Sequence, residues 1–403
     1  MKIRKMFLIL SMIPTMISLA SCQKEKEPKS DFKVDKQFIY GMDDIYWQEY
    51  SWEGISYTLE HQLFKSLGVK SIRFWAHATW MLSSPTKVNE KQAQIARDSL
   101  DEIKDEGYQI IGLNHGSFKL DYLGETNSTV TSAKPPRDLT EGSKYRRWLE
   151  DYQTSWYNLV KLFPEIKLWE IDNETNNTDF MKRVGGGQFS KHEMAEITYD
   201  MMYHASKGIH EGNPEAMTVM GGLVVRGAEN FLEDLYDMIY NVDDKGFWPS
   251  NNPDDYFQCA CWHPYMSGFN KKSFINVNNS IYEVVKRREG KDKRVFLTEA
   301  GINDSNYSNN EELCAQYIKD MYEAARDDLY YVESLHYYRM WDENSNGKRY
   351  GLFTDPTIKR EIGDVNIAAP KPAAFAYQEL TGATGDLHIY ENYVLENGVP
   401  PKP

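Results

Sequence analysis

Residues 167–174 read KLWEIDNE, a short apolar run that ends in acidic and amide side chains. Apolar runs of about four to eight residues, bounded by polar ones, are typical of strands buried on both faces. Amphipathic stretches at 144–162 and 191–210 flank this run and have the period of helices. A strand between two helices is the repeating unit of α/β proteins with a parallel sheet.

The same unit repeats along most of the chain. The pattern predicts strands at 38–42, 71–75, 109–114, 167–172, 218–223, 257–263, 294–299 and 332–338. It predicts helices at 57–67, 90–106, 144–162, 191–210, 229–240, 280–288, 311–327 and 373–380. Eight βα units within about 370 residues indicate an α/β protein with a single-domain (β/α)8 TIM barrel.

The alternative is a doubly wound open sheet. That fold usually carries a glycine-rich phosphate loop, G-x-G-x-x-G, after an early strand. No such motif follows 38–42 or 71–75, which favours the barrel. In a barrel, the long stretches at 117–142, 175–190 and 339–370 would wall the active face, because they follow strands. The insertion at 241–255 precedes a strand, so we expect it on the opposite face in a structural role.

The N-terminus carries a targeting signal. A basic start and an apolar run at 6–19 lead to Leu19-Ala20-Ser21-Cys22, which resembles a bacterial lipobox. We therefore predict a lipoprotein signal peptide at 1–21, lipid attachment at Cys22, a flexible tether at 22–36 and a catalytic domain at 37–403. The alternative is an ordinary signal peptide with an incidental cysteine. A lipid on Cys22 would anchor the protein to the bacterial outer membrane, on its periplasmic or cell-surface side.

Composition narrows the partners. The chain has 60 acidic and 46 basic residues, a net charge of −14, which disfavours nucleic acid as a partner. The 10 Trp and 27 Tyr could stack on sugars or fill the core. Cys259, Cys261 and Cys314 form no Cys-x-x-Cys pair, so we expect buried thiols rather than a zinc site or a disulfide framework. We expect a monomer.

Two of the predicted strands end in glutamate. Glu174 closes the fourth strand and Glu299 closes the seventh. Side chains at the C-terminal ends of barrel strands face the pocket, and these two strands lie nearly opposite each other in a ring of eight. Glycosidic cleavage requires such a pair, one group to protonate the leaving oxygen and one to attack the anomeric carbon.

These residues resemble those of clan A glycoside hydrolases, which share the TIM barrel and a retaining mechanism. Asn173-Glu174 and Glu299 match the clan's acid/base and nucleophile. Arg73 resembles its strand-two arginine near the nucleophile, and the segment 262–265, WHPY, resembles the strand-six segment whose tyrosine contacts it. Further matches are the segments 350–353 and 370–373, and the tail resembles β-xylosidase-like families. Thr175 departs from the proline that commonly follows the acid/base.

The resemblance implies a role for each residue. Glu174 would be the acid/base, with a pKa raised by burial and by the nearby charge of Glu299. Glu299 would be the nucleophile, kept ionised by Arg73 and Tyr265. Asn173 would bind the sugar 2-hydroxyl.

Other residues are candidates for substrate contact. His115 and His263 are expected in the wall of the sugar pocket, and Trp341 at the position where the clan often has a sugar-stacking tryptophan. An alternative role for Arg73 is a structural ion pair with Glu170. The chain contains no His-x-His or His-Glu-x-x-His motif, so we expect neither a metal nor an organic cofactor.

The sequence thus predicts a retaining glycoside hydrolase that cleaves β-linked bonds in a polysaccharide or oligosaccharide. Cleavage within a chain and trimming of its ends both remain open. The competing hypotheses are a non-catalytic glycan-binding lipoprotein on a TIM-barrel scaffold and a metal-dependent hydrolase. Retention of both carboxylates favours the enzyme.

Overall fold

The structure is a computed structural model that describes residues 37–43, 57–116, 118, 120–124, 133–241, 246–343, 347–355 and 368–397. The described residues all belong to one compact unit. The predicted signal peptide, tether and Cys22 lie outside them, so those boundaries stay predictions. Among the described residues, no helix combines the length and the apolar character needed to cross a bilayer.

Nine of the described strands form one parallel sheet in the order β10-β11-β12-β13-β1-β2-β5-β7-β9. Their bounds are β1 Ile39–Asp43, β2 Ser71–Trp75, β5 Gln109–Asn114, β7 Leu168–Ile171, β9 Met217–Met220, β10 Leu223–Val224, β11 Ala260–His263, β12 Val295–Ala300 and β13 Val332–Tyr337. β9 and β10 belong to one stretch, the predicted strand 218–223, which is interrupted at Gly221 and Gly222.

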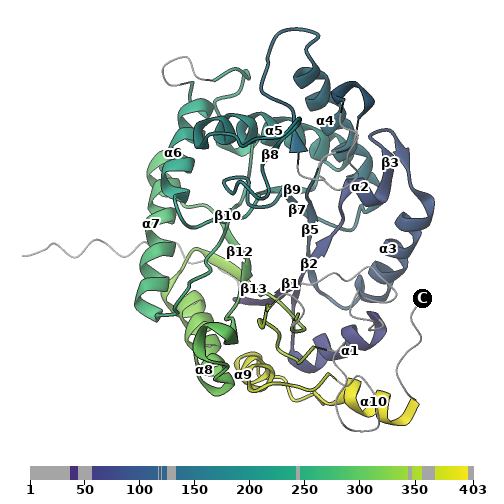
Figure 1. The fold of residues 1–403 in the computed structure, drawn as a ribbon, viewed down its shortest axis with the longest axis vertical. Helices are drawn as coiled ribbons and strands as arrows, with labels where there is room; N and C mark the ends of the chain where they lie inside the picture. Colours follow the sequence, from purple (N-terminus) through teal and green to yellow (C-terminus); the bar gives the residue numbers. More distant parts are fainter. Residues whose placement is uncertain are drawn as a thin grey trace, which may run out of the picture. The chain divides into compact units, whose positions relative to one another are not determined.

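The two ends of this strand order meet. Val219 of β9 forms a parallel bridge with Cys259, just before β11. The Met220 amide donates to the Cys259 carbonyl at 2.9 Å. The strands therefore close into a barrel, seen from one end in Figure 1. The predicted (β/α)8 fold is confirmed.

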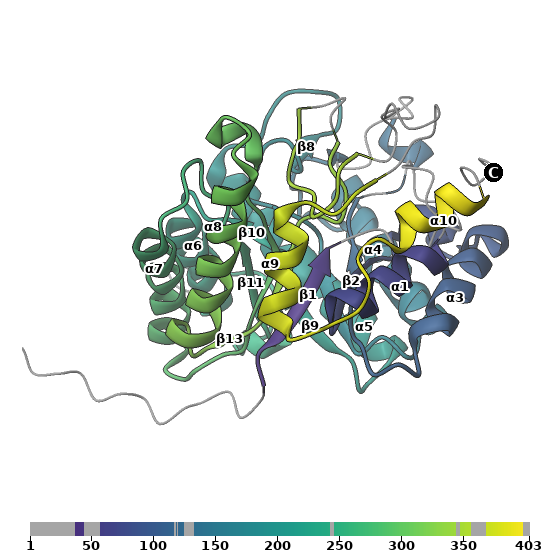
Figure 2. The same ribbon diagram turned by 90° about the horizontal axis from the view of Figure 1, so that it is seen from below.

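Helices follow the barrel strands and surround them (Figures 1 and 2). The main ones are α1 Tyr57–Leu67, α3 Glu90–Ile103, α4 Lys144–Leu162, α5 Lys191–Gly212, α6 Ala228–Ile239, α7 Lys271–Glu289, α8 Glu311–Glu323 and α9 Pro372–Thr381. Smaller elements are helices α2 Ala78–Met81 and α10 Ile389–Asn397, the antiparallel pair β3 Leu82–Ser84 and β4 Lys87–Val88, and the parallel pair β6 Ala133–Lys134 and β8 Lys182–Arg183. Short 3-10 turns occupy Asp121–Leu123, Pro253–Asp255 and Asp304–Tyr307.

Local chemistry explains where these helices begin and end. Ser190 caps α5 in a capping box with Glu193, which satisfies two free amides of the first turn. α7 begins at Lys271, well before the predicted 280, because the Asn270 side chain accepts the Ser273 amide and starts the helix there. α8 ends at Glu323 and continues as a π-helical turn over Ala324–Asp328, where the sequence predicted one α-helix to 327.

The barrel interior has an apolar layer below a polar one. Ile111, Leu168, Val219, Cys259, Cys261 and Phe296 form a buried cluster separate from the core between sheet and helices. Cys259, Cys261 and Cys314 are free and buried, as predicted. Close packing inside the barrel explains Gly41, because a Cβ there would lie 2.4 Å from the ring of His336. The insertion before β11 packs structurally, since Trp248 donates to Asp200 at 2.8 Å.

Candidate active site

Glu174 lies just past the end of β7, in a backbone segment fixed by the barrel. Its φ is +46°, and Asp172 also has a positive φ, of +66°. The Glu174 amide donates to the Gly222 carbonyl at 2.9 Å, which ties the segment to the break between β9 and β10. A Cβ on Gly222 would lie 2.0 Å from Nε2 of His263, so glycine is needed there.

Glu299 lies on β12, close to Glu174. One carboxylate oxygen of each residue and one ring nitrogen of His263 all lie within 4.8 Å of one another. Both glutamates are nearly buried, at 8% and 9% exposed. The structure therefore brings together the two carboxylates that the sequence placed on opposite strands.

Arg73, on β2, is fully buried beneath this pair. It donates to Oε1 of Glu299, to Oδ1 of Asn173 at 2.8 Å and to both oxygens of Glu170 at 2.7 and 2.8 Å. Its Nη1 also lies 3.4 Å from Asp43. Both roles considered for Arg73 from the sequence are therefore present at once: it contacts Glu299, and it pairs with Glu170.

Tyr265 contacts the other oxygen of Glu299. Its hydroxyl donates to Oε2 at 3.2 Å. Burial, and next the charge of Glu299, raise the pKa of Tyr265, so its hydroxyl keeps its proton and remains a donor. Its ring packs edge-on against Tyr338 and Tyr350, at centroid distances of 6.1 and 5.7 Å.

His263 lies between the two glutamates. Its Nδ1 is 3.1 Å from Oε1 of Glu174 and 3.6 Å from Oε2 of Glu299. Burial lowers the pKa of His263, but the charge of Glu299 and hydrogen bonds that include Glu174 outweigh burial and raise it well above its ordinary value. The raised pKa favours a proton on the ring that lies between the two carboxylates.

The prediction that the pKa of Glu174 is raised is wrong. Burial does raise it, but the hydrogen bond and charge of His263 and a 2.8 Å bond from Asn177 lower it more. The net pKa of Glu174 lies below its ordinary value. The sequence argument counted the charge of Glu299 but not a cation placed between the two acids.

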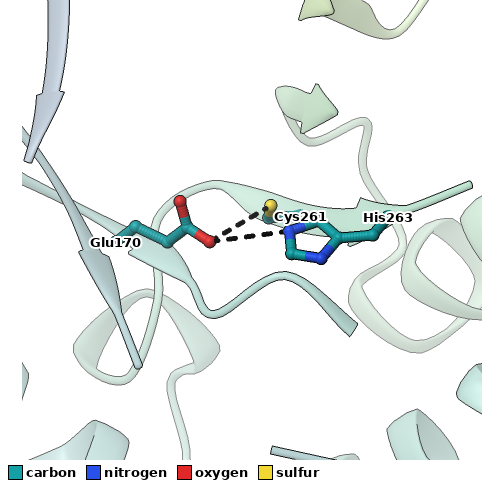
Figure 3. Close-up of side chains that lie close together, drawn as sticks. All are labelled: Glu170, Cys261 and His263. Atoms are coloured by element: carbon teal, nitrogen blue, oxygen red, sulfur yellow. Dashed lines mark hydrogen bonds and ion pairs between the residues drawn. The ribbon is translucent and has the colours of Figure 1, made fainter. Parts of the chain in front are cut away.

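Besides Glu174, His263 and Glu299, a second group of side chains could in principle bind a metal ion, and it lies deeper in the barrel. Glu170, Cys261 and His263 converge inside the barrel (Figure 3). Glu170 already accepts two bonds from Arg73, one from the Gly222 amide at 3.0 Å and one from Thr298 at 3.1 Å. Three of these bonds fall on Oε1 and one on Oε2, and a guanidinium lies beside the carboxylate. The donor set fits a hydrogen-bond network better than a cation.

His115 lies at the end of β5, beside this network rather than within it. Its Nδ1 contacts Oδ1 of Asp172, and its ring meets the edge of Phe180 at 5.3 Å. Lys134, fully buried on β6, lies 2.9 Å from the other oxygen of Asp172. The Asp172 carboxylate also accepts the Asn173 amide at 2.8 Å, so this group orients the segment that carries Asn173 and Glu174.

Trp341 does not line the site, which corrects the prediction for this residue. It is fully buried, its Nε1 donates to Oε1 of Glu60 at 3.0 Å, and its ring packs against Phe353 and Tyr390. A tryptophan does follow the last strand, as the resemblance to the clan implied, but its side chain turns toward the helices.

Sequence reasoning missed several residues of the site. Asp43 ends β1 and accepts a bond from Trp75 at 2.9 Å. The signal that identified Glu299, a carboxylate at a strand end, was equally present at Asp43. Thr298 and Asn177 had no such signal, because their roles depend on contacts with Glu170 and Glu174.

Solved structures share this barrel. A family 39 glycoside hydrolase from the gut symbiont Bacteroides cellulosilyticus WH2 matches with a TM-score of 0.58 and 15% identity, over 86% of this chain. The match covers 64% of that enzyme, less than two thirds of its length. A family 1 β-glucosidase from Thermotoga maritima, in complex with isofagomine lactam, matches with a TM-score of 0.59 and 13% identity, over 88% of this chain and 99% of that one.

At these identities the likeness establishes the fold, a (β/α)8 barrel of the kind found in glycoside hydrolases. No family model and no curated protein sequence matches the chain.

Proposed function

We propose that the protein is a retaining glycoside hydrolase acting on β-linked sugars, with Glu299 as nucleophile and Glu174 as acid/base. The observation that carries the proposal is the approach of the two carboxylates, whose nearest oxygens lie within 4.8 Å. Retaining enzymes hold this pair about 5–5.5 Å apart, whereas inverting enzymes leave room for a water. The β-glucosidase among the structural neighbours supports a β-glycoside as substrate.

The surroundings of Glu299 suit a nucleophile. Arg73 and Tyr265 bind one carboxylate oxygen each, which holds the group in place and favours its anionic form. In the first half-reaction, an oxygen of Glu299 attacks the anomeric carbon while a proton reaches the leaving oxygen from Glu174. In the second, Glu174 removes a proton from water, and the water oxygen displaces Glu299.

Asn173 is placed to assist this chemistry. Its Oδ1 accepts from Arg73, so the orientation of the amide is fixed and its Nδ2 remains a donor. Donation from Nδ2 to the sugar 2-hydroxyl would strengthen as positive charge develops on the ring.

The test uses two variants and an external nucleophile. Glu299→Ala and Glu174→Ala should each lower turnover of aryl β-glycosides by several orders of magnitude. Azide should rescue both, giving the α-glycosyl azide with Glu299→Ala and the β-glycosyl azide with Glu174→Ala. Wild-type rates in either variant would overturn the assignment. Sugar binding without turnover in the wild type would instead support the glycan-binding alternative.

We also propose that the protein is exported and anchored through a lipid on Cys22, at the bacterial outer membrane. The support is the lipobox-like sequence before Cys22 and the polar stretch that follows it. Metabolic labelling with a radioactive fatty acid should mark the wild type and not Cys22→Ala, which should also leave the membrane fraction. Equal labelling of both would refute the anchor.

A further inference from the structure

The hydrogen bonds beneath His263 fix which of its ring nitrogens carries a proton. Oγ1 of Thr298 lies 3.1 Å from Oε1 of Glu170 and 3.1 Å from Nε2 of His263. Glu170 is paired with Arg73 and, as a carboxylate, only accepts. Thr298 has one hydroxyl proton and three neighbours, because Sγ of Cys261 also lies 3.0 Å from its oxygen. The Glu170 carboxylate is the strongest acceptor of the three, so Thr298 gives its proton to Glu170. Its oxygen must then accept from His263, so Nε2 carries a proton whether the ring is charged or neutral.

The opposite nitrogen faces Glu174. With Nε2 protonated, Nδ1 has a proton only when the ring is an imidazolium. A neutral ring beside an ionised Glu174 would place two lone pairs 3.1 Å apart, which is repulsive. The contact therefore requires one proton between Nδ1 of His263 and Oε1 of Glu174.

We propose that His263 is a positioning residue that shares the acid proton with Glu174, so that the pair, rather than Glu174 alone, delivers and recovers the proton. The inference rests on the proposed function for its catalytic meaning. The hydrogen-bond geometry that carries it does not depend on activity. Thr298 and Glu170 act indirectly, by fixing the ring.

The proton balances over the catalytic cycle. In the first half-reaction the shared proton moves to the leaving oxygen as the glycosidic bond breaks and the bond to Glu299 forms. The pair is then empty, and the lone pairs of Nδ1 and Oε1 face each other. In the second half-reaction the attacking water gives a proton to the pair as its oxygen binds the anomeric carbon and Glu299 leaves.

Several charged or titratable groups face His263 from its own strand and from neighbouring ones. They are Glu170 on β7, Glu174 after β7, Cys261 on β11, Glu299 on β12 and Arg73 on β2. The carboxylates favour the imidazolium and outweigh both Arg73 and burial, in line with the raised pKa of His263. When Glu299 becomes an ester it loses its charge, which removes one source of that bias.

The kinetic test replaces His263 by Gln and by Asn, and Thr298 by Val. With His263 removed, Glu174 alone must hold the proton, so the alkaline limb of the kcat/KM profile should move to lower pH. Near neutral pH, kcat/KM for an alkyl β-glycoside should fall by about 10²-fold, the usual worth of general acid catalysis. A dinitrophenyl glycoside, whose leaving group needs no proton, should lose far less in the same parameter.

Acidification separates this role from a structural one. At low pH, where Glu174 is protonated without help, the alkyl glycoside activity of His263→Gln should recover toward wild type. Thr298→Val should show the same shift in weaker form. An equal loss for both leaving groups at every pH would overturn the proposal and leave His263 with a packing role only.

A spectroscopic test is independent of turnover. Nitrogen-15 NMR of the histidine rings, with His263 assigned by comparison with His263→Gln, reports the protonation of Nδ1 directly. In Glu174→Gln the His263 ring should lose its Nδ1 proton at lower pH than in wild type. The same titration in both proteins would overturn the proposal. A shifted titration in a protein that hydrolyses no glycoside would uphold the shared proton and reject the proposed function.

Discussion

Arg73 donates a hydrogen bond to Glu299, although the two residues lie 226 positions apart in the chain. The bond joins β2 to β12 through the barrel interior, where Arg73 is fully buried and also pairs with Glu170. Breaking a buried pair by removing one partner typically costs about 3–5 kcal/mol, because the other charge is left uncompensated. Arg73 therefore supports both the barrel and the orientation of Glu299.

Replacing Arg73 by Lys separates charge from geometry. Lysine keeps the positive charge but loses the planar fork that binds Glu170 through two nitrogens and Glu299 through a third. We expect kcat/KM for aryl β-glycosides to fall by roughly 10²-fold, the usual cost of losing one preorganised donor. Steady-state kinetics and thermal unfolding of the variant check this.

The matched control is Arg294→Lys. Arg294 makes the same kind of two-nitrogen contact with Glu333, at 2.5 and 2.6 Å, just before β12 begins. This control should lower the melting temperature and leave kcat/KM within a few-fold of wild type. Equal kinetic losses in the two variants would mean that Arg73 acts on stability alone.

Trp341 should matter for folding and not for substrate binding. Trp341→Phe removes the donor to Glu60 and leaves a small void in a fully buried site. We expect a loss of about 1–3 kcal/mol in unfolding free energy with KM unchanged. Urea denaturation and kinetics on one substrate decide it.

Trp75→Phe provides the contrast. Trp75 is partly exposed and donates to Asp43, a residue that faces Arg73. Here we expect KM to rise and stability to change little. A rise in KM for Trp341→Phe, with none for Trp75→Phe, would restore Trp341 as a substrate contact.

The barrel was predictable because its signals are local. Each strand is a short apolar run and each helix has its own period, so eight units can be counted without knowing a single long-range contact. The errors fall where tertiary contacts decide. β9 and β10 separate at Gly222 because His263, from the next strand, needs the space of a side chain there.

The site was predictable only in part, for the same reason. A glutamate at a strand end points into the pocket whatever surrounds it, so Glu174 and Glu299 could be named from the sequence. The protonation of Glu174 could not be predicted, because it depends on where the His263 ring lies between two strands. The prediction for Trp341 failed for a similar reason. The residue follows the last strand, but its side-chain conformation is set by Glu60 and by packing against α10.

Asp172 should stabilise the segment that carries Glu174. Its carboxylate lies between buried Lys134 and His115, and its φ of +66° is one that asparagine also tolerates. Asp172→Asn therefore removes charge with little backbone change. At neutral pH we expect a loss of about 3–5 kcal/mol, because Lys134 stays buried without its anion. The exposed Asp98→Asn on α3 should change stability by less than about 0.5 kcal/mol.

The stability that the Asp172–Lys134 pair contributes should depend on pH in a definite direction. Burial raises the pKa of Asp172, but the charges and hydrogen bonds of Lys134 and His115 lower it by more. The net pKa lies well below the ordinary value of 3.8. The folded state therefore binds fewer protons than the unfolded one, and the stabilisation is present above pH 3.8 and lost as pH falls below it. The gap between wild type and Asp172→Asn should narrow below that pH in urea titrations. A gap that stays constant would assign the loss to packing.

His204 should act in a higher pH window than Asp172, with the same direction: stability falls as pH falls. Burial, and next Lys207 and Arg146, lower the pKa of His204 from 6.5 to about 3. Its Nδ1 contacts Gln153 at 3.0 Å, and its ring meets the edge of Trp248. The unfolded chain takes up a proton here near pH 6.5 that the folded protein refuses, so stability is lost as pH falls from 6.5 toward 3.

Replacing His204 by Gln removes the proton that the unfolded chain takes up at this position. The unfolding free energy of wild type should fall more steeply than that of His204→Gln between pH 6.5 and 4, by up to about 1.4 kcal/mol per pH unit. Above pH 7.5 the two curves should run parallel, because His204 is then neutral in both states. Both proteins carry Asp172, so its titration cancels in this comparison. Parallel curves throughout would show that water reaches His204 in the folded state.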